Sequence, residues 1–137
     1  MQKEVLILDS NIWISYVITK RLNTLVTLIH HHQLTVLTSQ YLISEIQEVL
    51  SRPKFKKYLK HSEIKELIAI HLKLCRFVDT DETSDQLTDP KDNFLLNLYN
   101  KGKASIIVSG DKEFLHEASE LNYRVITFKE FELSYSL

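Results

Sequence analysis

Two aspartates follow apolar segments of the chain, and their placement predicts a chemical site. Residues 5–8 lead directly to Asp9, and residues 105–108 lead through Ser109 and a glycine to Asp111. Short apolar runs bounded by polar residues indicate buried strands of a parallel sheet. Because ligands of open α/β sheets bind beyond the carboxyl ends of the strands, both aspartates are expected at one functional edge.

Two further carboxylates lie on the apolar faces of predicted helices. Glu45 has Leu42 and Val49 as neighbours at helical spacing, whereas Glu48 points away from that face and is expected in solvent. Asp92 shares a predicted helix face with the apolar residues that follow it one and two turns later. Glu45 and Asp92 are therefore candidates to join the two strand-end aspartates.

Asp92 also has an ordinary structural explanation. Asp89 and Pro90 are typical of a helix start, and with Asp89 as the N-cap residue, Asp92 stands at the third helical position. This arrangement is close to a capping box, which stabilises a helix by roughly 1 kcal/mol. Capping and chemistry are compatible in one residue.

Four carboxylates at one sheet edge require a compensating positive charge. Two like charges about 4 Å apart repel by roughly 4 kcal/mol at an effective dielectric near 20. Since all the candidate ligand atoms are oxygens, Mg²⁺ or Mn²⁺ suits the site better than zinc. Such an ion polarises a phosphoryl group and generates a hydroxide nucleophile. The alternative is that these acids are caps and solvated turns among the 18 Asp and Glu residues of the chain.

Strands alternate with helices along the chain, which predicts a parallel sheet covered on both faces. The predicted strands are 5–8, 34–38, 76–78, 104–108 and 123–127. The predicted helices are 11–17, 22–32, 40–50 with Ser39 as N-cap, 62–74, 89–102 with Gly102 as C-cap, and 111–121. A loop is expected over 79–88 and a short closing turn around Phe131.

The composition is typical of one globular domain over residues 1–137. The chain is 44% hydrophobic and is long enough to bury a core. Cys75 is its only cysteine, so an internal disulfide is impossible and a reducing compartment is expected. No signal-peptide pattern precedes the first apolar segment, and no apolar stretch reaches membrane-spanning length. We expect a cytoplasmic protein without membrane association.

A local basic segment is the candidate surface for a polyanion. The net charge of −1 argues against a general basic coat. Cations and aromatic residues alternate between positions 52 and 60, and the cations that begin this segment are Arg52, Lys54, Lys56 and Lys57. A charge run is commonly a solvated helix face, so the segment alone decides nothing about function.

Other strand-and-aspartate protein classes fit less well. A phosphatase of the haloacid type has a second aspartate two positions after its nucleophile, and here that position is Asn11. A receiver domain needs paired acids after the first strand, which Asp9 lacks. The chain has only two glycines, which excludes a Gly-rich phosphate loop and a dinucleotide fingerprint.

Four ordered blocks of the sequence resemble PIN-domain ribonucleases. The blocks are Asp9-Ser10-Asn11, Glu45, Asp89-Pro90-Lys91-Asp92-Asn93 and Ser109-Gly110-Asp111-Lys112-Glu113-Phe114. More closely, the chain is similar to small prokaryotic PIN proteins classed as toxins of toxin–antitoxin pairs. The resemblance implies a three-layer α/β/α sandwich around a parallel sheet of about five strands.

The same resemblance implies roles for individual residues. Asp9, Asp92 and Asp111 would hold Mg²⁺ or Mn²⁺, while Glu45 would complete the cluster and help orient the attacking water. The supporting groups that hydrogen-bond to the ligands or to bound water would be Asn11, Asp89 and Ser109.

The activity implied is hydrolysis of RNA phosphodiester bonds in single-stranded or loop regions, with the basic segment contacting phosphates. The implied partners are an antitoxin protein and a second copy of the chain. A PIN-like module that binds nucleic acid or protein without catalysis is the alternative from another functional class.

Overall fold

Five parallel strands form the central sheet in the computed structural model, which describes residues 4–80, 87 and 92–137. The strands are β1 (Val5–Leu8), β2 (Thr35–Thr38), β3 (Arg76–Phe77), β4 (Ile106–Ser109) and β5 (Val125–Thr127). Their order across the sheet is β3-β2-β1-β4-β5, and each described neighbouring pair is parallel. The predicted parallel five-stranded sheet is confirmed.

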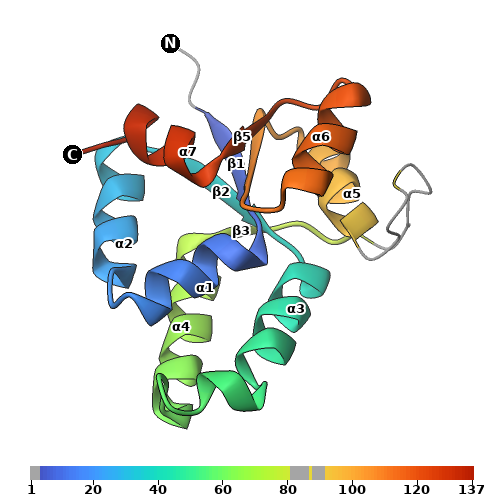
Figure 1. The fold of residues 1–137 in the computed structure, drawn as a ribbon. Helices are drawn as coiled ribbons and strands as arrows, with labels where there is room; N and C mark the ends of the chain where they lie inside the picture. Colours follow the sequence, from blue (N-terminus) through green and yellow to red (C-terminus); the bar gives the residue numbers. More distant parts are fainter. Residues whose placement is uncertain (1–3, 81–86, 88–91) are drawn as a thin grey trace.

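Helices cover both faces of this sheet. They are α1 (Ser10–Ile18), α2 (Leu22–His31), α3 (Gln40–Leu50), α4 (His61–Leu74), α5 (Asn93–Gly102), α6 (Lys112–Glu120) and α7 (Phe128–Ser134). Figure 1 shows α1, α2 and α4 on one side of the sheet and α5 and α6 on the other. The predicted α/β/α layering is therefore confirmed.

The two central strands are buried on both faces, as their uninterrupted apolar sequences predict. Leu6, Ile7 and Leu8 of β1 have no solvent exposure, and the side chains of β4 are likewise buried. Leu8 is in register with Val108, and the amide of Asp9 donates to the carbonyl of Val108 at 2.9 Å. This register brings the carboxyl ends of β1 and β4 together.

Helix α3 begins where the sequence predicts. The Ser39 hydroxyl accepts a hydrogen bond from the amide of Leu42 at 3.3 Å, which satisfies one of the unpaired amides at a helix start. Leu42, Ile46 and Leu50 form its buried face. Glu45 is half-buried on this helix, whereas Glu48 is exposed, so the predicted difference between the two glutamates is confirmed.

The end of α5 differs from the prediction that Gly102 caps it. Gly102 is instead the last residue of the helix, and Lys103 is the cap, with a left-handed φ of 55°. Packing explains the glycine, because a Cβ at position 102 would lie 2.3 Å from Leu37 Cδ1. The missing side chain allows α5 to pack closely on Leu37 of β2, and the φ of Gly102 is not in the left-handed region.

The predicted closing turn around Phe131 is also wrong, because these residues form a helix, α7. Thr127 and Glu130 make a capping box, in which each side chain accepts the backbone amide of the other residue, at 3.0 and 2.9 Å. Phe131 is fully buried and anchors α7 to the core. The predicted helix start at 89–91 and most of the loop over 79–88 lie outside the described residues. None of the described helices is long and apolar enough to span a bilayer.

Candidate active site

Asp9 is buried at the junction of β1 and α1, with only 5% of its surface exposed. Its Oδ1 accepts the amide of Ser10 at 2.7 Å. Its Oδ2 accepts the Asn11 side-chain amide at 3.1 Å and the Ser109 hydroxyl at 2.7 Å. Both carboxylate oxygens are thus oriented by donors, as a buried carboxylate requires.

The surroundings of Asp9 do not fully compensate its charge. Burial raises the pKa of the Asp9 carboxyl, and the negative charge of Asp111 raises it further. The hydrogen bonds from Ser109, Ser10 and Asn11 act in the opposite direction, but the pKa of Asp9 remains above its ordinary value. A cation placed beside these two carboxylates would relieve both the burial penalty and the repulsion.

Asp111 caps helix α6 and lies next to Asp9. Its Oδ1 accepts the amides of Glu113 at 3.1 Å and Phe114 at 3.2 Å. The amide of Asp111 donates to the Ser109 hydroxyl at 3.1 Å, and that hydroxyl donates to Asp9. Ser109 therefore connects the two aspartates, and a carboxylate at this helix start is also favoured by the helix dipole.

Asn11 makes a second connection between the ends of β1 and β4. Its amide nitrogen donates to Asp9, while its carbonyl oxygen accepts the amide of Gly110 at 3.0 Å. The two functions of one amide side chain hold the Asp9 carboxylate in place relative to the loop that carries Asp111. Asn11 and Ser109 thus have the contacts of supporting groups.

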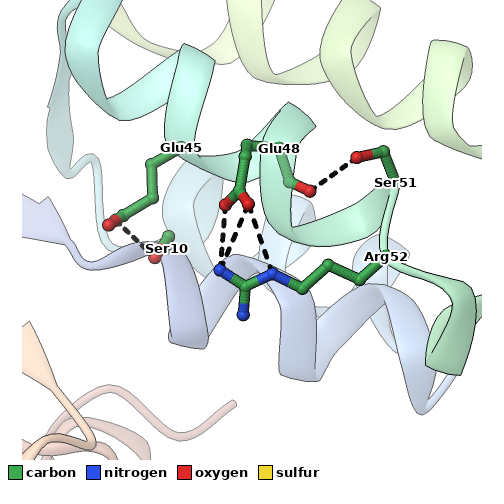
Figure 2. A network of polar contacts seen from close by, with 5 residues as sticks. All are labelled: Ser10, Glu45, Glu48, Ser51 and Arg52. Carbon is green, nitrogen blue, oxygen red and sulfur yellow. Dashed lines mark hydrogen bonds and ion pairs between the residues drawn. The ribbon is translucent and has the colours of Figure 1, made fainter.

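Glu45 reaches this site through a residue that the sequence analysis did not single out. The Ser10 hydroxyl donates to Glu45 Oε2 at 2.7 Å and lies 3.5 Å from Asp9 Oδ1. Figure 2 shows this link between the first turn of α1 and the middle of α3. In the sequence, Ser10 is marked only by its position directly after Asp9. That position does not show that its hydroxyl points towards Glu45.

The structure gives less support to a role in the site for the remaining candidate acids. Asp92 is half-buried and directly precedes α5, and its side chain makes no capping hydrogen bond to that helix. Asp89 lies outside the described residues, so the capping box between these aspartates is untested. Within residues 4–80, 87 and 92–137, no three His, Cys, Asp or Glu side chains form a group that could hold a metal ion. The convergence of all four acids stays a prediction.

The basic segment contains both paired and exposed cations. Arg52 forms an ion pair with Glu48 one turn earlier, at 3.0 Å, as Figure 2 shows. The ammonium groups of Lys54 and Lys57 lie 5.1 and 5.5 Å from the ring centroids of Phe55 and Tyr58, respectively. Lys54, Lys56 and Lys57 are exposed, so these three remain available to a polyanion.

A family comparison covers the segments that carry the candidate site residues and leaves out the C-terminal part of the chain. The model of the PIN domain family matches residues 5–113, a span that contains each of the four candidate acids. No curated protein matches the chain significantly.

Solved structures with low sequence identity share the fold. VapBC2 from Rickettsia felis, solved bound to a DNA fragment from its promoter, is 15% identical, with a TM-score of 0.59 over 90% of this chain and 98% of that chain. PAE2754 from Pyrobaculum aerophilum is 12% identical, with a TM-score of 0.62 over 98% of this chain and 90% of that one. A domain of a functionally unknown Methanocaldococcus jannaschii protein is 14% identical, with a TM-score of 0.54 over 91% of each chain.

Proposed function

The chain belongs to the PIN domain family, and we propose that it is a metal-dependent endoribonuclease that hydrolyses RNA phosphodiester bonds. The observation that carries this proposal is the buried Asp9 carboxylate held beside Asp111 at the ends of adjacent strands. Such a pair of like charges is costly to the fold, and perturbed carboxylates of this kind cluster at functional sites.

The donor set fits Mg²⁺ or Mn²⁺. Mg²⁺ is usually held by one or two carboxylates together with waters and substrate phosphates, so Asp9 and Asp111 suffice as the described protein ligands. The Oδ1 atom of Asp111 is occupied by two backbone amides, and the described residues offer no hydrogen bond to its Oδ2. Asp92 is proposed as a third ligand on the family resemblance, and metal binding would have to draw it towards Asp9 and Asp111, because the described residues form no group of three such side chains. The bound ion would polarise a phosphoryl oxygen and lower the pKa of a bound water.

The protein's own residues would orient the reacting groups. Ser10 holds Glu45 beside Asp9, which suits the Glu45 carboxylate to accept a hydrogen bond from the attacking water. Asn11 and Ser109 fix Asp9, and Asp89 is assigned a supporting role near Asp92. In this proposal Asp9, Asp92 and Asp111 hold the metal ion, whereas Glu45 positions the attacking water.

RNA is the proposed substrate, and the basic segment is the proposed phosphate contact. Lys54, Lys56 and Lys57 follow directly after the helix that carries Glu45, so one strand of RNA could contact both regions. Arg52 is assigned a smaller share, because its guanidinium is already paired with Glu48.

The biological role that we propose is the toxin component of a toxin–antitoxin pair. The similarity of fold to VapBC2 supports an association with a partner protein, here an antitoxin, and we also propose a homodimer. A non-catalytic PIN-like binding module is the competing proposal. Catalysis is supported over this alternative because specific donors orient the carboxylates of Asp9, Asp111 and Glu45.

The test is cleavage of a mixed panel of labelled RNAs by metal-stripped protein, before and after Mg²⁺ or Mn²⁺ is restored. Asp9→Asn and Asp111→Asn are compared with Glu120→Gln, an exposed carboxylate at the far end of α6. We expect metal-dependent cleavage that EDTA stops, that both aspartate variants lose and that the control retains. Metal binding by the wild type with no cleavage of any RNA would favour the binding module instead.

A further inference from the structure

A cavity of about 720 Å³ lies between α3, the turn η1 (Pro53–Phe55) and α4. Its apolar lining includes Leu50 and Leu59, which are buried, and Ile64 and Ile68, which are half-buried. The volume lies within the range of roughly 300–1,000 Å³ that is typical of small-molecule pockets. None of the candidate metal ligands or their supporting residues lines it, and Lys56 is the residue that it shares with the basic segment proposed to contact RNA.

The polar part of this cavity carries positive charge. Lys56, His61 and Lys65 line it together with two uncharged polar residues, and no Asp or Glu is among the described lining residues. In the described part of the chain, the side chains of these three basic residues have no ion pair or hydrogen bond. By contrast, Lys20 and Arg52 are each paired with a glutamate. The lining therefore complements an anion.

The start of α4 adds to this positive potential. Helix α4 has 14 residues and begins at His61, so its dipole places partial positive charge at the same end of the cavity. The acid of its first turn, Glu63, points elsewhere: it accepts the amide of Lys60 at 3.0 Å and pairs with Lys20 at 2.6 Å. Glu63 lines a separate cavity with Lys20 and is not among the described residues that line this one.

We propose that this cavity binds an amphiphilic carboxylate, a small molecule with an apolar body and one carboxylate group. The apolar body covers Leu50, Leu59, Ile64 and Ile68, and the carboxylate is held near Lys56 and Lys65 at the start of α4. The buried apolar side chains and the exposed lysines of the lining match the two parts of such a ligand. The proposal does not depend on nuclease activity.

Three probes of equal chain length test the proposal on the full-length protein. Octanoate and octylammonium are titrated below their micelle-forming concentrations and octanol below its solubility limit, and binding is followed by amide chemical shifts. We expect saturable shifts at the lining residues with octanoate, weaker binding of octanol and the weakest binding of octylammonium. Equal affinity for octanoate and octanol would show that the carboxylate is not recognised and would overturn the proposal.

The basic segment supplies a matched pair of variants. Lys56→Gln with Lys65→Gln removes two cations from the lining and should weaken octanoate binding about tenfold, equivalent to roughly 1.4 kcal/mol. Lys54→Gln with Lys57→Gln removes two cations that are exposed but outside the lining, and the affinity should stay the same. An equal loss in both double variants would show non-specific attraction to net charge and refute the site.

Discussion

The Ser10 hydroxyl lies 2.7 Å from Glu45 Oε2 and ties the first turn of α1 to α3. It also lies 3.5 Å from Asp9 Oδ1, so one small side chain fixes the spacing of two candidate catalytic carboxylates. Ser10 is 7% exposed, and the hydrogen bond is therefore shielded from competing water. We regard Ser10 as a positioning residue for Glu45.

Replacing Ser10 by alanine should lower kcat for RNA cleavage by about 10-fold to 100-fold with little change in KM. The hydrogen bond to a charged partner is worth roughly 1.5–3 kcal/mol, and its loss frees Glu45. Ser10→Thr, which keeps the hydroxyl, should restore most of the rate. Ser51→Ala is the matched control, because Ser51 Oγ donates only to the Glu48 carbonyl on the exposed end of α3. A loss of rate in Ser51→Ala as large as that in Ser10→Ala would contradict this role.

Asp111→Asn should stabilise the protein at pH 7 while abolishing metal-dependent cleavage. The pKa of Asp9 is raised in the folded protein, partly by Asp111. Ionised Asp9 therefore lowers the free energy of unfolding above its folded pKa, and this loss of stability disappears as the pH falls. Asparagine removes the repulsion and still caps α6 but loses the favourable interaction of the charge with the helix dipole, and we expect a net gain of about 0.5 kcal/mol in urea unfolding. Asp111→Ala should lose roughly 1 kcal/mol through the missing cap. Equal destabilisation by both substitutions would show that the repulsion is unimportant.

Acid should destabilise the fold through His71, which is fully buried. Its Nε2 is hydrogen-bonded to Thr38 Oγ1 at 2.7 Å, and burial lowers the pKa of His71 to about 4. In the unfolded chain, the His71 imidazole is protonated near pH 6.5. The contribution of neutral His71 to the free energy of unfolding is therefore complete above that pH and is lost as the pH falls towards 4, by up to about 3 kcal/mol.

The measurement for His71 is urea unfolding at several pH values between 7 and 4. His71→Gln, which does not titrate, should be less stable at pH 7 but should show a shallower loss of stability with acid. His116→Gln, at an exposed position of α6, should keep the wild-type slope. An unchanged slope in His71→Gln would assign the acid sensitivity to other groups.

RNA binding should depend on the exposed lysines of the basic segment more than on Arg52. Replacing Lys54, Lys56 and Lys57 by glutamine should weaken binding and reduce the slope of log affinity against log salt by about 2, near 0.7 per lost contact on a single strand. Arg52→Gln should change the slope less, because Arg52 already pairs with Glu48. Filter binding over a range of salt concentrations measures both. An unchanged slope in the triple variant would remove this segment from the RNA-binding surface.

Local sequence patterns predicted the features that depend on local chemistry. The apolar runs before Asp9 and Asp111 indicated buried parallel strands, and parallel pairing alone then places their ends together, as the register of Leu8 with Val108 shows. The N-cap at Ser39 also follows from a local pattern. In these cases the residue and its partner are close in sequence or belong to paired strands.

Features that depend on packing between distant segments were missed or misread. The direction of the Ser10 hydroxyl is set by where α3 packs, 35 residues away, and no local pattern encodes it. Gly102 was interpreted as a cap because a glycine near a helix end usually is one, whereas its neighbour Leu37 decides its role. The capping box of α7 was a readable local signal, since Thr127 and Glu130 have the required spacing.

Gly102 has a consequence for the candidate site at the opposite end of α5. The helix is a rod about 15 Å long, with Gly102 against β2 at one end and Asp92 immediately before the other. A side chain at position 102 would force the Leu37 side chain, this end of α5, or both to move. The absence of a side chain at Gly102 therefore helps to fix how closely α5, which Asp92 precedes, packs on the sheet.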